Sequence, residues 1–485
     1  MTLQDVFQST LAILPLAVLV LWATLLILVD LFIPSHRKWL TALLSALGMV
    51  VSLVLLLVGT GQEQAAFNGM VVMDGFAVFL QALFLISGLA AIALSYDYLI
   101  RMEIDRSEYY ILLMFSIAGM MLMSMAADLI VVFLALELLS IPLYVLAGFA
   151  RPRIGSEEAA MKYFLLGAFA TGFVVYGVAL VFGATTTTSL AGIVAAVEGG
   201  SANLTLLTVG AALLLVGLGF KVAAVPFHMW TPDVYEGSPS AVTAFMSVGA
   251  KAGGFAALLR VFVTAFPALS VDLTPILWVL SALTMILGNV VAISQRNIKR
   301  LLAYSSIAQA GYILMALVPY GQPQVSSNSV AAALFYLVAY AVTSFGAWSV
   351  VITLERAEGR GLDLDDYAGL SRRYPLLAAA MTVFMLSFTG VPPTLGFVGK
   401  FYLFSTVIEG GFIGLALIGV LTSLVSAYYY LRVVVYMYMR EGEPLATSGR
   451  WIYLTAGVAA VATVVLGIFS APLFAWASQA VLQLF

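Results

Sequence analysis

Three lysines, Lys221, Lys251 and Lys400, lie inside long apolar stretches of a chain that otherwise places its charges mainly between such stretches. Glu137 is the one acid that the pattern places equally deep. A cation near the centre of a bilayer costs about 2.5–3.5 kcal/mol even on the lenient insertion scale, so intramembrane lysines usually serve a function. A neutral lysine accepts a proton and an ammonium donates one. This set of residues therefore predicts proton transfer inside a membrane.

The composition predicts an all-α polytopic membrane protein. Apolar residues make up 63% of the 485 residues and charged residues 9%, which is too little polar surface to cover a soluble globule of this length. The net charge of −3, without a basic run, gives no sign of a nucleic-acid partner. The absence of cysteine excludes disulfides and cysteine-ligated iron–sulfur clusters. With no phosphate-binding glycine loop and no metal-ligand cluster in the sequence, we expect no cofactor and no metal in this chain.

A spanning helix needs about 20 mostly apolar residues, and the sequence predicts about fourteen transmembrane helices. The predicted segments are 10–33, 38–59, 74–98, 108–126, 128–150, 159–183, 204–230, 238–265, 273–294, 300–319, 328–355, 375–408, 411–438 and 452–482.

Loop charges support this number of segments. The loops after odd-numbered segments carry Lys and Arg, and those after even-numbered segments carry none. The basic loops contain Arg37, Lys38, Arg101, Arg106, Arg151, Arg153, Arg296, Lys299, Arg356 to Arg373, Arg440 and Arg450. The exception is the loop after segment 7, which has Asp233 and Glu236 but no cation. The positive-inside rule then predicts cytoplasmic basic loops and both termini on the outer side.

Two further cations inside segments, Arg260 and Arg432, lie near segment ends, where we expect their long side chains to snorkel to the interface. A buried lysine can also pair with a carboxylate simply to fix helix register. With Glu137 as the one deep acid, most of the intramembrane lysines have no such partner.

Four prolines predict two broken helices. Pro226 and Pro232 interrupt the segment around Lys221, and Pro392 and Pro393 interrupt the segment around Lys400. Proline removes a backbone donor, so the freed carbonyls must face protein or water instead of lipid. The simpler interpretation is that these prolines only kink their helices.

Broken helices at corresponding positions of two halves are typical of inverted-repeat transporters. We therefore predict a three-helix N-terminal segment (1–107), two inverted five-helix repeats (108–265 and 266–438) and a C-terminal helix (439–485). Each repeat has an odd number of helices, which inverts the second copy.

Residues 217–239 read Gly-Leu-Gly-Phe-Lys-Val-Ala-Ala-Val-Pro-Phe-His-Met-Trp-Thr-Pro-Asp-Val-Tyr-Glu-Gly-Ser-Pro and are followed by Lys251. With this stretch the chain resembles the antiporter-like membrane subunits of respiratory complex I and of multisubunit cation/proton antiporters. The resemblance extends over nearly the whole chain. Two further stretches carry it: Asn-Ile-Lys-Arg-Leu-Leu-Ala-Tyr-Ser-Ser-Ile at 297–307 and Thr-Leu-Gly-Phe-Val-Gly-Lys-Phe-Tyr at 394–402. The lysine in the second broken helix and the absence of a long C-terminal extension are most similar to the N-type subunit of NADH-quinone oxidoreductase.

The resemblance implies a proton relay. Glu137 matches the family's fifth-helix glutamate, which pairs with the lysine at the position of Lys221. Lys251 matches the central lysine and Lys400 the last lysine before the outer side. His228 matches a histidine that relays protons between the first two lysines, although an imidazole at a helix break can also cap free carbonyls.

Other residues are implied in secondary or supporting roles. Lys162 aligns with a basic residue that some members keep beside the glutamate, and Lys299 and Tyr304 lie in the second matching stretch. Gln309 stands where many homologues have histidine. Because glutamine cannot exchange a proton, a relay there would use water, Tyr304 or a neighbouring side chain.

The implied function is proton translocation in an NADH-quinone oxidoreductase of a bacterial inner membrane, where this chain contributes no redox centre. FMN, iron–sulfur clusters and quinone are then expected in partner subunits, and the neighbours would be homologous antiporter-like subunits, small membrane subunits and lipid. Burial disfavours an ammonium and a nearby carboxylate favours it, so opening and closing the Glu137–Lys221 pair would switch Lys221 between releasing and holding a proton. Three different functions stay open: a subunit of a sodium/proton antiporter, the plastid or cyanobacterial counterpart in a thylakoid membrane, and a structural spacer that transports nothing.

Overall fold

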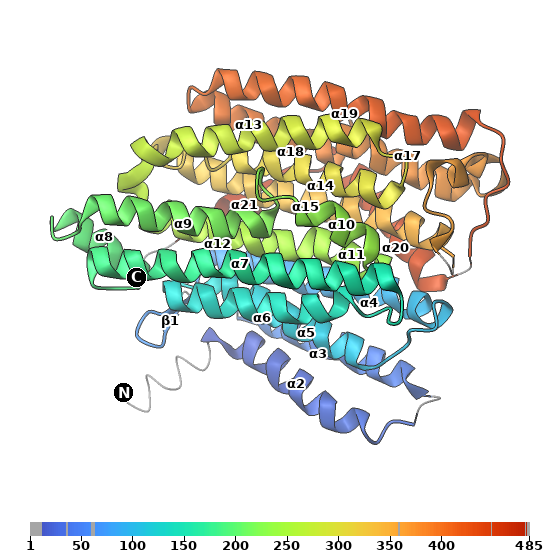
Figure 1. Cartoon of the computed structure of the whole chain (residues 1–485), viewed down its shortest axis with the longest axis horizontal. Helices are drawn as coiled ribbons and strands as arrows, with labels where there is room; N and C mark the ends of the chain where they lie inside the picture. Colours follow the sequence, from blue (N-terminus) through green and yellow to red (C-terminus); the bar gives the residue numbers. More distant parts are fainter. Residues whose placement is uncertain are drawn as a thin grey trace.

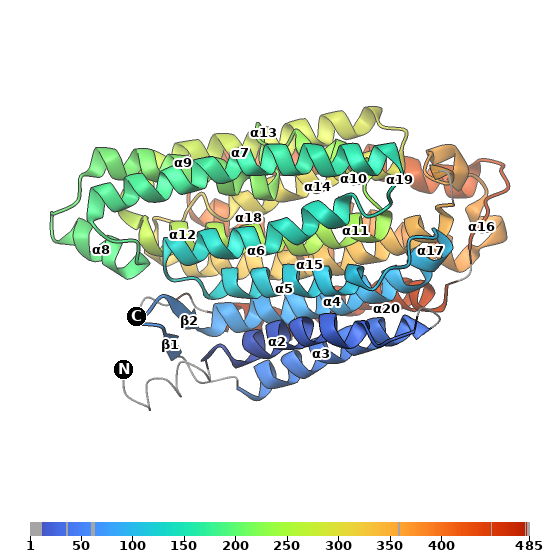
Figure 2. The ribbon, with the colours of Figure 1, turned by 60° about the horizontal axis from the view of Figure 1, so that its bottom comes forward.

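The computed structural model describes residues 12–34, 37–59, 64–356, 359–447, 449–480 and 482. The chain folds as a bundle of helices that run mostly along one direction, with α2 (Leu14–Asp30) and α3 (Trp39–Val58) at one edge (Figures 1 and 2). The remaining α-helices are α4 (Gly75–Arg101), α5 (Glu108–Met125), α6 (Leu129–Ala147), α7 (Ile154–Thr185), α8 (Leu190–Glu198), α9 (Leu204–Val222), α10 (Trp230–Gly237), α11 (Ser240–Phe245), α12 (Lys251–Ala265), α13 (Ser270–Ser294), α14 (Ile298–Met315), α15 (Pro323–Leu354), α16 (Leu370–Arg373), α17 (Pro375–Thr389), α18 (Leu395–Glu409), α19 (Ile413–Met439), α20 (Arg450–Ile468) and α21 (Ala471–Gln479).

This architecture confirms the helical membrane fold. A helix, or a run of consecutive helices, lies in each of the fourteen predicted segments, although residues 10 and 11 of the first and the last residues of the chain lie outside the described part. Within the described residues, eleven helices are long and apolar enough to cross a membrane. α2 and α17 are apolar but shorter. The inverted relation of the two five-helix sets stays a prediction.

Both predicted helix breaks are present. α9 ends at Val222 and α10 begins at Trp230, while α17 ends at Thr389 and α18 begins at Leu395. Each first half ends next to a left-handed residue, Ala223 with φ 62° or Gly390 with φ 90°. This conformation stops the helix and is costly for any residue except glycine.

The sequence analysis did not predict a third irregularity. Five residues of π-helix, η2 (Met246–Ala250), join α11 to α12 immediately before Lys251. Such bulges insert an extra residue into the helical turn and are frequent at functional sites. Here the bulge sets the direction in which the first residue of α12 points.

The predicted all-α chain also contains a small hairpin, formed by β1 (Gln64–Ala66) and β2 (Val71–Met73) in the loop after α3. Its turn includes Asn68 and Gly69, both with positive φ. Asn-Gly between short apolar runs is a strong hairpin signal, and it lies in a loop that hydropathy alone leaves unassigned.

The expectation that Arg260 snorkels to the interface is wrong. Its side chain is 1% exposed and makes a two-pronged ion pair with Asp74, with N–O distances of 2.5 and 2.8 Å. Asp74 is the N-cap of α4 and also accepts from the backbone N–H of Ala77. The cation therefore ties α12 to the start of α4, and Glu137 is not the one acid within the protein interior.

Candidate functional site

Lys221 is held by neutral side chains. It is 3% exposed, one residue before the end of α9, and its Nζ donates to the hydroxyls of Ser140 at 2.8 Å and Tyr163 at 3.0 Å. The ring of Tyr163 stacks on Trp230, with 4.6 Å between centroids. Since Trp230 begins α10, the helix break itself fixes one of the two partners of Lys221.

Glu137 lies near Lys221 but does not form the expected hydrogen-bonded pair. Its Oε1 accepts from the hydroxyl of Thr171 on α7 at 2.7 Å, and no ion pair joins it to Lys221 among the described residues. The two charges interact electrostatically, and Ser140, which accepts from Lys221, lies one turn after Glu137 on α6. Glu137 and Lys221 are therefore separated, and each of them binds hydroxyl groups instead of the other.

Lys251 has a single hydrogen-bonding partner among the residues that the structure describes. It is 2% exposed, and its Nζ donates to the main-chain carbonyl of Ser306 on α14 at 2.5 Å. The Ser306 hydroxyl in turn accepts from Tyr340 at 2.9 Å. Lys221 packs beside the same helix as Lys251, because a side chain on Gly254 would lie 3.2 Å from Lys221 Cγ. Because glycine has no side chain, Lys221 can pack against α12 at Gly254, which lies one helical turn after Lys251.

Lys400 is bound by the helix break itself. Its Nζ donates to the carbonyls of Phe388 at 2.9 Å and Thr389 at 3.0 Å, and to the Ser423 hydroxyl at 2.6 Å. In a continuous helix those carbonyls would accept from residues 392 and 393, which are both proline and have no N–H. The two prolines therefore create the acceptors that hold this lysine.

α14 connects Lys251 to Lys400. Gln309, one turn after Ser306, donates to the Phe388 carbonyl at 3.3 Å and to the Tyr430 hydroxyl at 3.1 Å, and it accepts from Tyr336. The Phe388 carbonyl is thus shared between Gln309 and Lys400.

Tyr304, the expected substitute for a histidine at position 309, is only partly buried. It makes no hydrogen bond to Gln309 within the described residues. Tyr336 and Tyr430, instead of Tyr304, form hydrogen bonds with Gln309.

His228 lies in the first break and is partly exposed. Its Nδ1 has no hydrogen-bond partner among the described residues. The imidazole interacts with the backbone carbonyl of Pro226, in keeping with a capping role. A relay between Lys221 and Lys251 through His228 stays a prediction.

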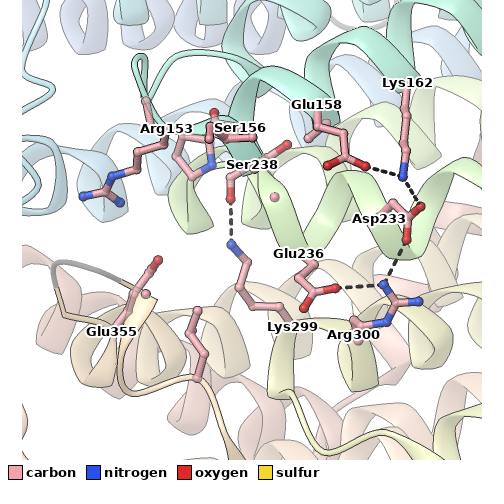
Figure 3. Close-up of a pocket in the computed structure, with 18 of the residues that line it drawn as sticks. Arg153, Ser156, Glu158, Lys162, Asp233, Glu236, Ser238, Lys299, Arg300 and Glu355 are labelled. Atoms are coloured by element: carbon pink, nitrogen blue, oxygen red, sulfur yellow. Dashed lines mark hydrogen bonds and ion pairs between the residues drawn. The ribbon is translucent and has the colours of Figure 1, made fainter.

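Lys162 and Lys299 lie apart from the three central lysines, at a cavity near the starts of α7 and α14 (Figure 3). Lys162 pairs with Glu158 and Asp233, each at 2.7 Å, instead of lying beside Glu137. Asp233 also pairs with Arg300 at 2.9 Å. Burial alone would raise the pKa of Asp233, but the hydrogen bonds from Lys162 and Arg300 outweigh it and lower that pKa.

A family profile described as the transmembrane region of NADH:quinone oxidoreductase and Mrp antiporters matches residues 126–426, more than half of the chain. The chain belongs to this family. The match runs from α6 into the first half of α19, and so it includes both breaks and all three central lysines.

Individual family members are similar over nearly their full length. NADH-quinone oxidoreductase subunit N of Chloroflexus aggregans is 49% identical, covering 97% of this chain and 96% of its own, and that of Trichlorobacter lovleyi is 48% identical with the same coverage. A chain of respiratory complex I from Thermus thermophilus superimposes with a TM-score of 0.82 at 36% identity, covering 95% of this chain and 98% of that one. A chain of the Mrp complex from Dietzia sp. has a TM-score of 0.85 but 22% identity, over 99% and 97%, and shares the fold.

Proposed function

We propose that this family member is the N-type, proton-translocating membrane subunit of an NADH-quinone oxidoreductase. The observation that carries the proposal is the row of three buried lysines whose ammonium groups are held by hydroxyls and carbonyls, with no carboxylate within ion-pair distance among the described residues. Buried cations without counter-ions are costly. Each such lysine is poised to lose its proton when the environment changes.

The arrangement supports lateral transfer at membrane depth. Lys221 packs against α12, the helix that begins with Lys251. Lys251 and Lys400 are connected by α14, through Ser306 and Gln309. A proton leaving one ammonium needs a neutral lysine at the next position, with water or hydroxyls between them. Movement of the Glu137 carboxylate from Thr171 to Lys221 would stabilise the first ammonium and so set the direction of transfer.

Proton movement against a membrane potential costs about 2.3 kcal/mol per charge at 100 mV. We propose that electron transfer in partner subunits, with FMN, iron–sulfur clusters and quinone, supplies this energy. The partners would be the other membrane subunits of a bacterial complex, homologous and small ones together. The membrane would be the bacterial inner membrane, with the basic loops cytoplasmic and both termini periplasmic.

The test uses the purified complex in vesicles with Lys251→Met, which keeps the length of the side chain and removes the proton acceptor. We expect assembly to survive, while NADH-driven acidification and turnover fall together by about 10²-fold or more, the contribution of one proton-transfer group. Lys38→Met is the matched control, because Lys38 is partly exposed and pairs with Asp30 near the membrane surface.

Normal acidification in Lys251→Met would show that the chain is a spacer. Copurification separates a redox complex from an ion-driven antiporter. Flavin and iron–sulfur proteins with the chain support the proposal, whereas their absence, together with sodium-dependent proton exchange in vesicles, would support a subunit of a sodium/proton antiporter.

A further inference from the structure

A cavity of about 800 Å³ opens at the end of the bundle that carries the basic loops. Its walls come from the starts of α7 and α14, from α10, and from the residues that follow α15, so both five-helix sets contribute (Figure 3). A polar cavity of this size holds many water molecules.

Most of the charges that line this cavity neutralise one another. Glu158, Lys162, Asp233, Arg300 and Glu236 form a continuous row of ion pairs with N–O distances of 2.7 to 2.9 Å, and their side chains are 30–59% exposed. Exposed pairs of this kind contribute little energy. They also leave little net charge to bind an ion.

Two lining residues differ from this row because they are buried. Lys299 is 2% exposed and donates to the Ser238 carbonyl at 2.6 Å, and Glu355, directly after α15, is 4% exposed. Figure 3 shows both at the cavity, with Lys299 directed to Ser238. They interact electrostatically, but no ion pair within 4.0 Å joins them in the described part of the chain.

One carboxylate oxygen of Glu355 is unused. Oε1 accepts from the Tyr98 hydroxyl at 3.3 Å, whereas Oε2 is buried and has no hydrogen-bond partner among the described residues. The neighbouring charged and titratable groups are Arg101 and Tyr98 of α4, Lys299 of α14 and Tyr367 of the 3-10 turn η5 (Leu364–Tyr367). The two terminal nitrogens of Arg101 donate to the Thr447 hydroxyl and to the Ile352 carbonyl. A buried carboxylate oxygen left this way is costly unless it binds a proton or water.

Glu355 is connected to the helix that carries Lys251. The Tyr98 hydroxyl, which donates to Glu355, also accepts from the backbone N–H of Ser240 at 3.1 Å. Ser240 begins the run α11–η2–α12, and Lys251 lies eleven residues further, roughly 16 Å along the helix.

Buried hydroxyls surround the same stretch. Those without a hydrogen-bond partner among the described residues are the hydroxyls of Thr231, Ser238 and Ser240. Tyr235 interacts with Tyr340 and with the side chain of Ser306. Tyr340 also donates to the Ser306 hydroxyl, and the carbonyl of the same serine accepts from Lys251. Unpaired hydroxyls can donate to and accept from ordered water. They therefore offer a path for a proton between the cavity and Lys251.

We propose that Glu355 is the group that takes up protons from the cavity and passes them to Lys251. A hydronium ion in the cavity gives its proton to the carboxylate of Glu355 and leaves water. The O–H bond of the resulting acid then breaks, and a new N–H bond forms on neutral Lys251 after relay through the hydroxyls and water between them, which restores the carboxylate. This inference rests on the proposed function, because it assigns the uptake step of the same pathway.

The test compares Glu355→Gln, Glu355→Asp and Tyr98→Phe in the purified complex in vesicles. Glu355→Gln keeps the shape and removes the exchangeable proton, so we expect NADH-driven acidification to fall about tenfold, less than the usual effect of a general acid or base because cavity water offers a slower route. Glu355→Asp should keep most of the activity, and Tyr98→Phe should lose less than Glu355→Gln. Infrared difference spectra of the parent during turnover should contain a carboxylic acid band that Glu355→Gln lacks.

The matched control is Glu157→Gln, which removes an exposed acid that pairs with Arg151 outside the cavity and should pump like the parent. Parent-like pumping in Glu355→Gln would overturn the inference. So would an equal loss of assembled complex in Glu355→Gln and Glu355→Asp, because that result assigns Glu355 a structural role as a counter-charge. A parent complex that moves no protons would instead overturn the proposed function.

Discussion

The two broken helices stabilise their lysines in different ways. At the first break Lys221 precedes the interruption and donates to two side-chain hydroxyls, while the indole of Trp230 donates to the Phe220 carbonyl at 2.9 Å. At the second break Lys400 follows the interruption and itself donates to the two carbonyls that the prolines release. Lys221 depends on hydroxyls of neighbouring helices, whereas Lys400 depends on two carbonyls of its own broken helix and on one hydroxyl, that of Ser423 on α19.

This difference determines which parts of the structure can change the environment of each lysine. The partners of Lys221 belong to α6 and α7, so a shift of those helices, or of Glu137 between them, can change its environment. The carbonyls around Lys400 lie at the C-terminal end of α17, whose dipole favours a cation. We infer that Lys221 is the adjustable site and Lys400 the fixed one.

The largest effect should come from Lys400→Met. This change removes the proton carrier and takes one donor each from the carbonyls of Phe388 and Thr389, which keep only Gln309 and Ser423 as donors among the described residues. We expect acidification in vesicles to fall by about 10²-fold or more, with slower NADH-driven turnover.

Lys400→Glu sharpens the same point, because a carboxyl group can also carry a proton. Facing two carbonyl acceptors, the new side chain can bind only when it is protonated, so we expect partial recovery at acidic pH and little at alkaline pH. Parent-like pumping in Lys400→Met would remove this lysine from the pathway.

Glu137→Gln should have the next largest effect. The amide keeps the contact with Thr171 and removes the negative charge near Lys221, so the ammonium form of that lysine loses its electrostatic support. We expect about tenfold less proton translocation, as for the loss of one nearby opposite charge, with normal amounts of assembled complex. If the number of protons moved per electron is unchanged, Lys221 is not adjustable through Glu137.

Gly390→Ala and Ala223→Gly exchange the left-handed residues of the two breaks. A side chain at Gly390 would lie 3.0 Å from Cδ of Lys400 and would adopt φ 90°. We expect a loss of about 1–2 kcal/mol in the free energy of unfolding, measured as a lower melting temperature, together with reduced pumping. Ala223→Gly relieves the same conformation at the first break and should leave the melting temperature equal or higher. Equal effects of both changes would contradict the difference between the breaks.

The sequence predicted the membrane fold and the breaks because both depend on local chemistry. Runs of apolar residues and missing proline N–H groups act within one segment. The carbonyls that hold Lys400 could also have been found in this way, since Phe388 and Thr389 lie four residues before Pro392 and Pro393.

The partners that come from other segments could not be predicted. Arg260 pairs with Asp74 across 186 positions of sequence, and Glu355 meets Tyr98 across 257. Nothing within either segment indicates the other. The Glu137–Lys221 pair was expected from the family, but it is open here because Ser140, on the same helix as Glu137, takes the ammonium.

The smallest effect should come from Tyr163→Phe. The change removes one of the two hydroxyls that bind Lys221 and keeps the ring that stacks on Trp230, so the fold should be unaffected. The loss of one hydrogen bond, about 1 kcal/mol, should bring the Lys221 ammonium closer to Glu137 and slow proton release by a few fold. Tyr428→Phe is the control, because Tyr428 is 60% exposed on α19 and contributes to neither lysine. If Tyr163→Phe reduces acidification as strongly as Lys400→Met does, then Lys221 is held as rigidly as Lys400, and the contrast between an adjustable and a fixed site is wrong.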